Sequence, residues 1–436
     1  MQIAAAAGRI ADSPRPQNQY RTIESTGIMR SFSIYTVTSK AEKSLRSGHP
    51  WVYAEEITGM SAQAANGALV DVKSAKGAYL GTGWVSEASK IRVRVISTNA
   101  NDKFDEAFWR RRVRYAIAYR QTVMGERDFH ACRLIFGESD QFPGLVVDRF
   151  ENVLVAQVMS IGIEQRKDMI FRIIVEELRE MGQQVDVLYE RNDVATRGLE
   201  GLEQYKNFYT NTELHLTNSH DGHVEISENG IKFDVNYIDG QKTGYFLDQK
   251  YNRQAIMKIA RGRRVLDCFT HTGAFALHAY RGGAAHVTAV DISQLAIDQA
   301  RANAERNDIH DIEFVCANVF ELLTQRFERG EKSDDFIILD PPAFTKSHAT
   351  ARDAYRGYKE INLKAMRLLP RGGYLATCSC SHFMKDDMFR QMLTEAAHDA
   401  NVSLRQIEAR QQSPDHPILL NVPETNYLKF YIFQVV

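Results

Sequence analysis

Residues 264–275 constrain the fold of this chain more than any other segment. A short apolar run, Val265 and Leu266, ends in an acid, Asp267, and a polar turn with one glycine, Gly273, leads into residues that can form a helix. A strand, a loop and a helix in this order are typical of a doubly wound α/β sheet, whose ligands bind beyond the carboxyl ends of the strands. The segment predicts such a site, and an ordinary strand-to-helix turn is the alternative.

The loop of this segment narrows the class of ligand. It lacks the G-x-G-x-x-G spacing that lets a pyrophosphate approach the backbone. An adenosine without phosphates suits the loop better, and S-adenosylmethionine is such a ligand. Asp267 is then expected near the charged methionine end of the cofactor, and Phe269, Thr272 and Gly273 are counted with the same loop.

Length and composition indicate a globular protein of more than one domain. The chain has 436 residues, 44% of them hydrophobic and 25% charged, which is enough for roughly two to four domains. We find no run of 18 apolar residues, so no membrane span is predicted. Five scattered cysteines indicate a reducing compartment, and we expect a cytoplasmic protein. Because the net charge is −1, binding of nucleic acid would need a local basic patch.

The first part of the chain divides into an extension and a β-rich unit. Residues 1–32 are small and polar and are predicted to be disordered, with either Met1 or Met29 as the true start. Residues 33–100 contain strand-like runs separated by glycine-bearing turns. The last run, 91–96, alternates strictly, so that Arg92 and Arg94 are expected to share one face. This face predicts a phosphate-binding surface, and a solvated strand face is the alternative.

A basic stretch follows this strand. Residues 90–133 carry 11 Lys/Arg against 5 Asp/Glu. Phe108, Val113 and Ile117 have helical spacing, and the same predicted helix carries Arg111 together with Arg110, Arg112, Arg114 and Arg120. The stretch predicts an RNA-facing stripe, although charge runs are most often solvated helix faces.

The rest of the chain is predicted to hold two further domains. Residues 101–236 contain strand-like runs and a helix near 164–181, which indicates a small central α+β domain that acts as a connector. Residues 237–436 alternate strands and helices, which is the pattern of a Rossmann-like α/β domain. The expected strands of this domain are 264–268, 286–291, 313–316, 336–340, 373–378 and 427–435.

Polar residues follow the second and third of these strands. Asp291 ends the second strand, and a carboxylate at this place accepts hydrogen bonds from both ribose hydroxyls of a bound adenosine. Ile292 comes next, and Ser293 is predicted to cap the following helix. Asn318, after the third strand, has the donor and acceptor needed to read an adenine edge, although it is also a good helix N-cap.

The fourth strand ends in Asp340, Pro341 and Pro342. The two prolines stiffen the loop and can hold Asp340 toward a planar substrate. Enzymes that methylate exocyclic amines often place an aromatic ring directly after such a motif. Here Ala343 occupies that position and Phe344 comes one residue later, which weakens the amine interpretation.

Two cysteines, Cys378 and Cys380, end the fifth strand. No second cysteine pair has zinc spacing, so a metal site is not predicted. A thiolate that adds to carbon 6 of a pyrimidine makes carbon 5 nucleophilic enough to accept a methyl group. Asp340 is then expected to hydrogen-bond the ring. Buried structural cysteine is the alternative, and it is the interpretation preferred for Cys132, Cys268 and Cys316.

The chain resembles the RlmI-type family of 23S ribosomal RNA cytosine-5 methyltransferases over nearly all residues after 33. The resemblance implies a PUA domain, a central α+β domain and a Rossmann-like class I methyltransferase domain that uses S-adenosylmethionine. It rests on the motifs at residues 42–52, 136–150, 240–249, 340–342, 355–362 and 379–381.

The family's functional residues carry over to matching positions. Cys380 takes the place of the nucleophile, and Asp340 supports it. Position 318 is Asn where many relatives have Asp, and Pro342 stands where other RNA cytosine-5 enzymes have a second cysteine, so that one thiol serves both attack and release. The cofactor site is predicted to include Gln241, Phe246, Asp248, Asp267, Gly273, Asp291, Asn318 and Asp340. Substrate binding is predicted for Pro341, Pro342, Phe344, Arg92, Arg94 and Arg111.

The leading hypothesis is therefore a methyltransferase that forms 5-methylcytosine in 23S rRNA, with free rRNA or the large ribosomal subunit as its partner. The first alternative is an rRNA enzyme of the same fold that acts on guanine or on an exocyclic amine. The second is a non-enzymatic RNA-binding factor. The target nucleotide is not specified by the sequence, which also leaves a homodimer open.

Overall fold

The computed structural model describes residues 32–344 and 351–436. Contacts divide the chain into residues 1–32 and a compact unit, 33–436, to which the following description applies. The predicted extension, with Met1 and Met29, lies outside the described residues except for Phe32. None of the helices in the described ranges is long and apolar enough to cross a membrane.

Residues 33–97 form a six-stranded sheet whose order is β2-β6-β5-β4-β1-β3. Its core consists of small branched side chains such as Val52, Val70, Val72 and Val93, which are fully buried. The short strands β2 and β3 were not predicted, because three or four residues give little periodicity. The elements are β1 (Ser33–Val37), α1 (Ser39–Arg46), β2 (Trp51–Tyr53), β3 (Ile57–Met60), β4 (Leu69–Ser74), β5 (Tyr79–Val85) and β6 (Ile91–Ser97).

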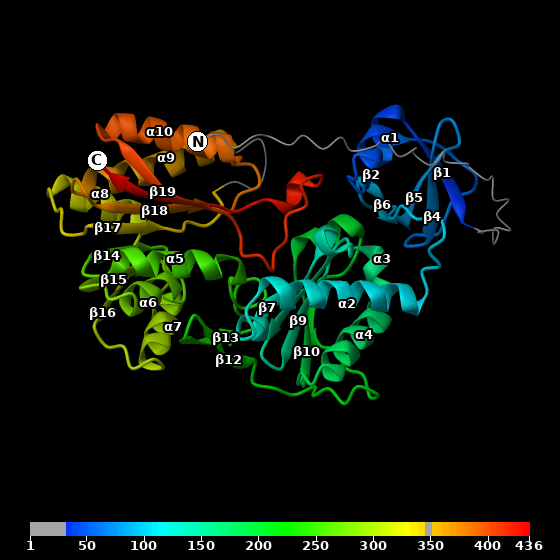
Figure 1. Ribbon diagram of the computed structural model, residues 1–436, viewed down its shortest axis with the longest axis horizontal. Helices are drawn as coiled ribbons and strands as arrows, with labels where there is room; N and C mark the ends of the chain where they lie inside the picture. Colours follow the sequence, from blue (N-terminus) through cyan, green and yellow to red (C-terminus); the bar gives the residue numbers. More distant parts are fainter. Residues whose placement is uncertain (1–31, 345–350) are drawn as a thin grey trace, which may run out of the picture. The chain divides into compact units, whose positions relative to one another are not determined.

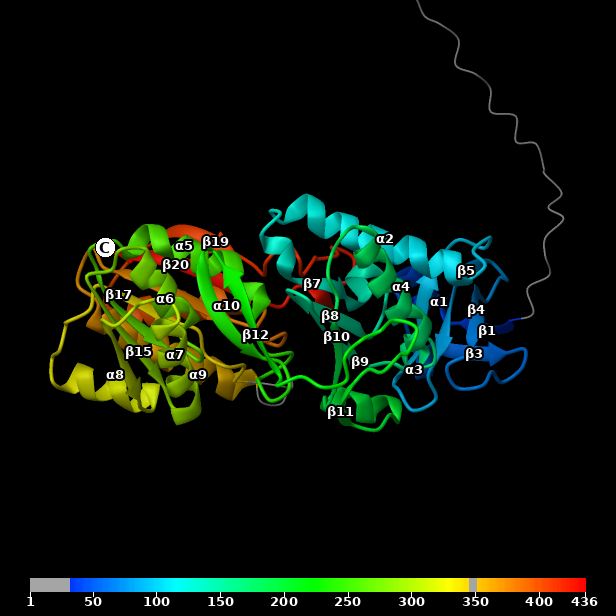
Figure 2. The ribbon, with the colours of Figure 1, turned by 90° about the horizontal axis from the view of Figure 1, so that it is seen from below.

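A second sheet, ordered β11-β10-β9-β8-β7, follows. Helices α2 and α4 lie beside it and contact each other (Figures 1 and 2). As predicted, Phe108, Val113 and Ile117 form the buried face of α2. The elements are α2 (Glu106–Val123), β7 (Ala131–Phe136), β8 (Leu145–Phe150), β9 (Val153–Val158), α3 (Ile161–Glu164), α4 (Lys167–Glu180), β10 (Val187–Asn192) and β11 (Tyr205–Phe208).

A hairpin, β12 (His223–Glu228) and β13 (Ile231–Asn236), leads into the last sheet. Its turn is Asn229-Gly230, and both residues have positive φ, 52° and 81°. Asn-Gly is the preferred pair for such a two-residue turn because both positions require a left-handed backbone. The Asn-Gly pair is therefore a sequence signal for this hairpin, which was not predicted.

The last sheet has seven strands in the order β16-β15-β14-β17-β18-β20-β19. Its first five strands are parallel and β20 runs antiparallel between β18 and β19. Five strands match the predicted ones within a residue at each end, whereas β19 was not predicted. The strands are β14 (Arg264–Cys268), β15 (His286–Asp291), β16 (Ile312–Cys316), β17 (Phe336–Leu339), β18 (Tyr374–Ser379), β19 (Leu404–Arg410) and β20 (Lys429–Val435).

Helices cover both faces of this sheet. Figure 1 shows α5, α6 and α7 on one face and α8, α9 and α10 on the other. The order of the strands reverses between β14 and β17, which is where open α/β sheets bind their ligands. The helices are α5 (Lys250–Ala260), α6 (Ala274–Arg281), α7 (Gln294–Glu305), α8 (Val319–Glu328), α9 (Ala351–Leu368) and α10 (Asp386–Ala400).

The loop between β19 and β20 ties this sheet to the central one. Arg120 of α2 is fully buried and donates to both carboxylate oxygens of Asp140, at 2.5 and 2.7 Å, and to the Asp415 carbonyl at 2.8 Å. The Asp415 carboxylate accepts from the backbone of Arg133 at 2.8 Å. The arginine therefore fixes a loop that is almost 300 residues away in sequence.

This geometry predicts that Arg120→Met lowers the free energy of unfolding by about 3–5 kcal/mol, because it leaves the Asp140 charge buried without its partner. Arg111→Met on the same helix is the matched control. Arg111 is 48% exposed and is 3.5 Å from Asp102, so its loss should cost less than about 1 kcal/mol. Urea unfolding of both variants measures the difference, and equal costs would contradict the assigned role of Arg120.

Candidate active site

The loop after β14 has an unusual backbone. Phe269, His271 and Gly273 have φ of 65°, 49° and 81°. A left-handed conformation is strained for the two side-chain-bearing residues, and such strain clusters at functional sites. A Cβ on Gly273 would lie 2.8 Å from Leu277 Cδ1 and 3.0 Å from Ala300 Cβ, so only glycine fits there.

Asp267 lies buried beneath this loop. Its Oδ2 accepts from the Thr270 hydroxyl at 2.5 Å, whereas its Oδ1 has no partner among the described residues. Burial first, and then the charges of Asp340 and Asp291, raise the pKa of Asp267 to about 8, although the hydrogen bond from Thr270 opposes this rise. A cation bound beside such a buried carboxylate stabilises its ionised form. Thr272, which was also predicted for this site, is buried and accepts at its carbonyl from the side chain of Asn303.

Asp291 joins this loop to the end of β15. Its two oxygens accept from the backbone N–H groups of His271, at 3.0 Å, and Ser293, at 2.9 Å. Each oxygen keeps a second lone pair, which a ribose hydroxyl can use. The neighbouring Ile292 is 70% exposed, which is unusual for so large an apolar side chain. Ser293 caps α7 as predicted.

Asn318 follows β16 and caps α8. Its side-chain oxygen accepts from the backbone of Phe320 at 2.9 Å. The cap uses the oxygen that was expected to bind adenine, so only the second lone pair of that oxygen is left for a ligand. Cys316, at the end of the same strand, is exposed, and its interpretation as a buried structural cysteine was wrong.

Residues 240–249 contribute a second buried carboxylate. Asp248 Oδ2 accepts from the Tyr427 hydroxyl at 2.6 Å, and its Oδ1 is buried without a partner in the described part of the chain. The Phe246 ring meets the His271 ring edge-on, with centroids 5.3 Å apart. Gln241 is exposed. This segment thereby contacts the loop after β14.

Asp340 lies at the end of β17, and all its hydrogen bonds within the described ranges are on Oδ1. The Cys378 thiol donates to this oxygen at 2.9 Å, and Gln249 Nε2 donates to it at 3.2 Å. Burial raises the pKa of Asp340 to about 6. Oδ2 is left for a ligand.

Gln249 was not identified as a site residue from the sequence. Besides Asp340, its amide contacts Cys378 Sγ at 3.4 Å, and its Oε1 accepts from Asn252 at 2.6 Å. Arg410 in turn donates to Asn252 at 3.1 Å. This chain of contacts orients the Asp340 carboxylate. Gln249 lies within a motif that was recognised, but only the folded chain brings it beside β17.

The two thiols of β18 differ. Cys378 is buried and bonded to Asp340, which keeps it protonated; burial raises its pKa well above the ordinary value. Cys380 lies just beyond the strand and is partly exposed. Burial first, and then the charges of Asp340 and Asp248, raise the pKa of Cys380 to about 12, while Lys242 and Lys429 oppose this rise. Cys380 thus lies at the carboxyl end of β18, close enough to Asp340 for the two groups to interact electrostatically.

The loop after Asp340 is only partly described. Pro341 is buried, Pro342 is exposed and residues 345–350 lie outside the described ranges. The Phe344 ring packs against Tyr358, with centroids 4.6 Å apart, and against Phe320 at 5.8 Å. The ring is part of an aromatic cluster, which does not favour its use as a stacking platform for an amine substrate.

The predicted RNA-facing stripe is corrected by the structure. Arg94 is buried and pairs with Glu200 at 2.8 Å, because β6 is covered on both faces. Arg120 is buried as well, as described above. On α2, carboxylates of α2 and α4 neutralise two arginines: Arg110 pairs with Glu106, Glu176 and Glu177, and Arg114 with Glu177 and Glu180. The spacing of arginines could not reveal these partners.

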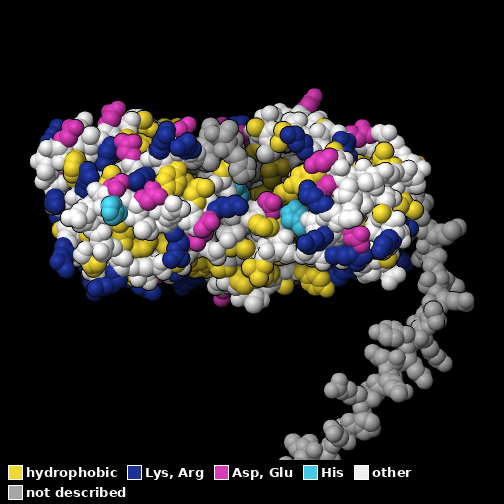
Figure 3. Space-filling view, turned by 90° about the horizontal axis from the view of Figure 1, so that it is seen from above, with side chains coloured by type: hydrophobic (Ala, Val, Ile, Leu, Met, Phe, Trp, Pro, Cys, Tyr) yellow, Lys and Arg dark blue, Asp and Glu magenta, His cyan; other side chains and the backbone are white. Residues whose placement is uncertain are grey.

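Two predicted arginines keep solvent access. Arg92 is partly exposed and donates to the Glu87 carbonyl at 2.7 Å, and Arg111 pairs only weakly with Asp102. Lys43 and Lys90 are exposed on the same β-rich unit. Acidic and basic side chains both occur across the face in Figure 3. Any basic surface in the described chain is thus smaller than the sequence indicated.

Four carboxylates therefore gather at the carboxyl ends of β14, β15 and β17: Asp248, Asp267, Asp291 and Asp340. The neighbouring cation, Arg253, is already paired with Glu228, whose carboxylate it meets at 2.5 and 2.8 Å. Two oxygens of this cluster, Asp248 Oδ1 and Asp267 Oδ1, are buried without a hydrogen-bond partner among the described residues. These residues fit an adenosine ligand that carries positive charge, as S-adenosylmethionine does at its sulfonium and amino groups.

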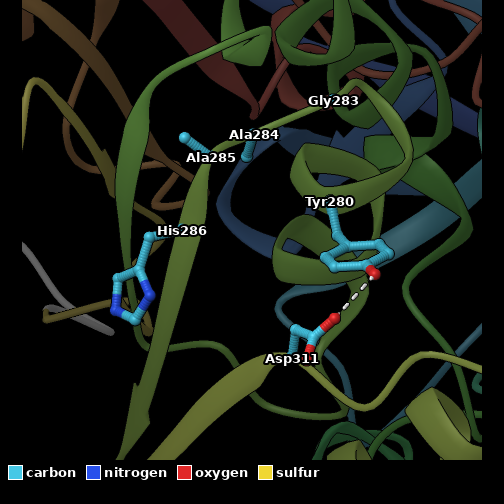
Figure 4. Close-up of a pocket in the computed structure, with 6 residues that line it drawn as sticks. All are labelled: Tyr280, Gly283, Ala284, Ala285, His286 and Asp311. Carbon is cyan, nitrogen blue, oxygen red and sulfur yellow. Dashed lines mark hydrogen bonds between the residues drawn. The ribbon is translucent and has the colours of Figure 1, made fainter.

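A separate hollow of about 440 Å³ lies at the other end of the strands (Figure 4). Tyr280, Gly283, Ala284, Ala285, His286 and Asp311 line it. His286 begins β15 and Asp311 precedes β16, so the hollow is at the amino ends of these strands. It is therefore not part of the site described above.

Comparisons with known proteins agree with this site. Residues 194–434 match the family model of S-adenosylmethionine-dependent methyltransferases, and residues 36–98 match that of PUA-like domains. A solved protein from Streptococcus mutans, assigned to S-adenosylmethionine-dependent methyltransferases, has a TM-score of 0.76 at 21% identity and covers 92% of this chain and all of its own. A second solved structure, complexed with SAH, has a TM-score of 0.77 with the same identity and coverage. These two structures support the fold.

Curated relatives are closer in sequence. Ribosomal RNA large subunit methyltransferase I of Photobacterium profundum is 41% identical over 400 residues, which cover 91% of this chain and 98% of the relative. The proteins of that name from Pseudoalteromonas translucida and Escherichia coli O157:H7 are 40% and 39% identical, cover 90% and 93% of this chain, and are themselves covered to 97% and 100%. The chain therefore belongs to the S-adenosylmethionine-dependent methyltransferases, in the family of ribosomal RNA large subunit methyltransferase I, and carries a PUA-like domain before its catalytic domain.

Proposed function

We propose that this protein methylates carbon 5 of a cytosine in 23S rRNA through a covalent adduct between Cys380 and carbon 6. The observation that carries the proposal is the pair formed by a partly exposed thiol at the end of β18 and a carboxylate at the end of β17 whose Oδ2 has no protein partner among the described residues. S-adenosylmethionine supplies the methyl group, and Asp267, Asp248 and Asp291 hold it.

The contrast between the two cysteines supports Cys380 as the nucleophile. The Cys378 thiol is engaged by Asp340 and Gln249 in the interior, so it cannot reach a substrate. Cys380 has no hydrogen bond within the described residues and is partly exposed. Its sulfur forms a bond to carbon 6, and electrons move to carbon 5 and onto the ring. Carbon 5 then takes the methyl group.

Asp340 supports this step because its pKa of about 6 lets it exist in both protonation states near neutral pH. A protonated carboxyl group can donate to the ring N3 and thereby stabilise the electrons displaced by the thiolate. It can also accept from the exocyclic amino group. After methyl transfer, a base removes the carbon 5 proton, the carbon–sulfur bond breaks and Cys380 leaves.

The substrate class is inferred from the family and from the PUA-like domain. We propose free 23S rRNA or the large subunit as the partner, with Lys43, Lys90, Arg92 and Arg111 as the exposed basic residues that contact its phosphates. An unstacked cytosine is needed, since a base in a helix cannot reach the site. We also propose that the protein is cytoplasmic, that it forms a homodimer and that its domains divide at residues 100 and 236.

The cysteine proposal predicts that Cys380→Ala lowers methyl transfer to 23S rRNA by at least about a thousandfold, because the covalent route is lost. Cys378→Ala is the matched control on the same strand and should retain most activity. Both are measured with labelled cofactor under single-turnover conditions. In RNA with 5-fluorocytosine at the target, fluorine replaces the proton that must leave, so wild-type protein should stay attached through Cys380. Unchanged activity of Cys380→Ala would refute the mechanism.

The carboxylate cluster predicts a pH-dependent affinity for S-adenosylmethionine. Asp267 has a pKa of about 8 in the free protein and is mostly protonated at pH 7. A bound cation favours the ionised form, so binding releases a proton and affinity rises between pH 6.5 and 8, by at most about tenfold per pH unit. Calorimetry in buffers of different ionisation enthalpy measures both effects.

Asp267→Asn should abolish this slope, whereas Asp291→Asn should weaken binding at every pH and keep the slope. A wild-type affinity that does not change over this range would contradict the role of Asp267.

Mapping of the modified nucleotide by mass spectrometry in rRNA from cells without this protein tests the base itself. Loss of a methylated guanine in place of 5-methylcytosine would favour the alternative enzyme.

A further inference from the structure

Lys429, the first residue of β20, is a buried cation that has no counterion in the described part of the chain. It is 6% exposed, and its Nζ donates to the carbonyl oxygens of Ser381 at 2.7 Å and Tyr427 at 2.8 Å. Within the described residues no carboxylate pairs with it. The other buried lysine, Lys250, does have an ion pair, with Asp128 at 3.3 Å.

This arrangement is costly for stability alone. A buried ammonium group without a counterion loses its hydration and recovers only part of it through two carbonyl groups. An apolar residue would suit β20 better, since most residues of the strand are buried and hydrophobic. A buried charge that packing does not require is a candidate for a functional role.

The position of Lys429 indicates what that role is. Lys429 pairs with Ser379 in the register of β18 and β20, and its Nζ donates to the carbonyl oxygen of Ser381. Ser379 and Ser381 are the two sequence neighbours of Cys380, so Lys429 lies beside this cysteine. Cys380 and Lys429 act on each other electrostatically. The other charged or titratable groups that act on one or both of them include Asp340, Asp248, Lys242, Asp386, Cys378, His382 and Tyr358.

We propose that Lys429 is a positioning residue that makes the Cys380 thiolate accessible near neutral pH, an inference that rests on Cys380 being the nucleophile proposed above. The S–H bond of Cys380 breaks and its proton passes to solvent water. The ammonium group of Lys429 stabilises the thiolate until it attacks, and a proton from water returns to the sulfur when the carbon–sulfur bond breaks.

Two further features agree with this role. Burial lowers the pKa of Lys429 to about 8, so that the amine is mostly protonated and positively charged at pH 7. Asp340 and Asp248 oppose ionisation of Cys380, whereas Lys242, which is exposed, and Lys429 favour it. Water screens the exposed lysine more strongly than the buried one.

The experiment measures the alkylation of Cys380 by iodoacetamide between pH 6.5 and 10 in the full-length protein, by mass spectrometry of the peptide. Lys429→Met should slow the reaction at pH 8 and at pH 10 by at least about tenfold, which corresponds to a rise of about one unit in the pKa of the thiol. Lys429→Arg keeps the positive charge and should keep most of the wild-type rate at both pH values. Lys242→Met, the matched control, should change the rate less than about threefold.

Cys378 reports folding in the same spectra, because it is buried and stays unmodified unless the domain opens. A variant in which Cys378 reacts is replaced by the milder Lys429→Gln. An unchanged alkylation profile in Lys429→Met, with Cys378 protected, would overturn the proposal. This readout does not depend on methyl transfer, so failure of the cytosine mechanism, seen as activity in Cys380→Ala, is distinguished from failure of the role of Lys429.

Discussion

The negative charge at the carboxyl edge of the last sheet is the constraint on which the site depends. Asp248, Asp267 and Asp340 are held close together, and burial disfavours the ionised forms of Asp267 and Asp340. In a domain selected only for stability, such carboxylates would be paired with arginines, as Glu228 is with Arg253. Here two oxygens have no partner in the described chain. Part of the interior thus remains suited to a cation, and the strained loop after β14 lies between that interior and Asp291, the proposed ribose-binding residue.

The same constraint explains why two thiols two residues apart have different chemistry. Both are near Asp340, whose charge raises the pKa of each. The Cys378 thiol donates a hydrogen bond to the carboxylate and so has a structural role. Cys380 has no such bond among the described residues, and burial together with the charges of Asp340 and Asp248 keeps it protonated. Positive charge near Cys380, from the bound cofactor or from Lys429, therefore favours its thiolate.

Features with short-range signals could be predicted from the sequence. β14, β15, β17 and β18 each contain a short apolar stretch, and Ser293 before a helical pattern identified the start of α7. The site residues at strand ends followed from the rule that parallel strands meet at one edge. The short strands β2, β3 and β11 were not predicted, because each has only three or four residues. β19 escaped because it is a mostly polar edge strand, whose alternation is not visible without its partner β20.

Features that depend on distant partners could not be predicted. The arginines of α2 form a basic run in sequence, yet Glu176 and Glu177 on α4 and Asp140 after β7 neutralise them in the fold. Gln249 acts on Asp340 across about 90 residues, and Lys429 reaches the carbonyl of Ser381 only through an antiparallel pairing. In each case the role of one polar residue depends on a second residue that lies beside it only in the folded chain. The chemistry of the site is therefore set less by the motifs themselves than by the balance of charge that folding creates around them.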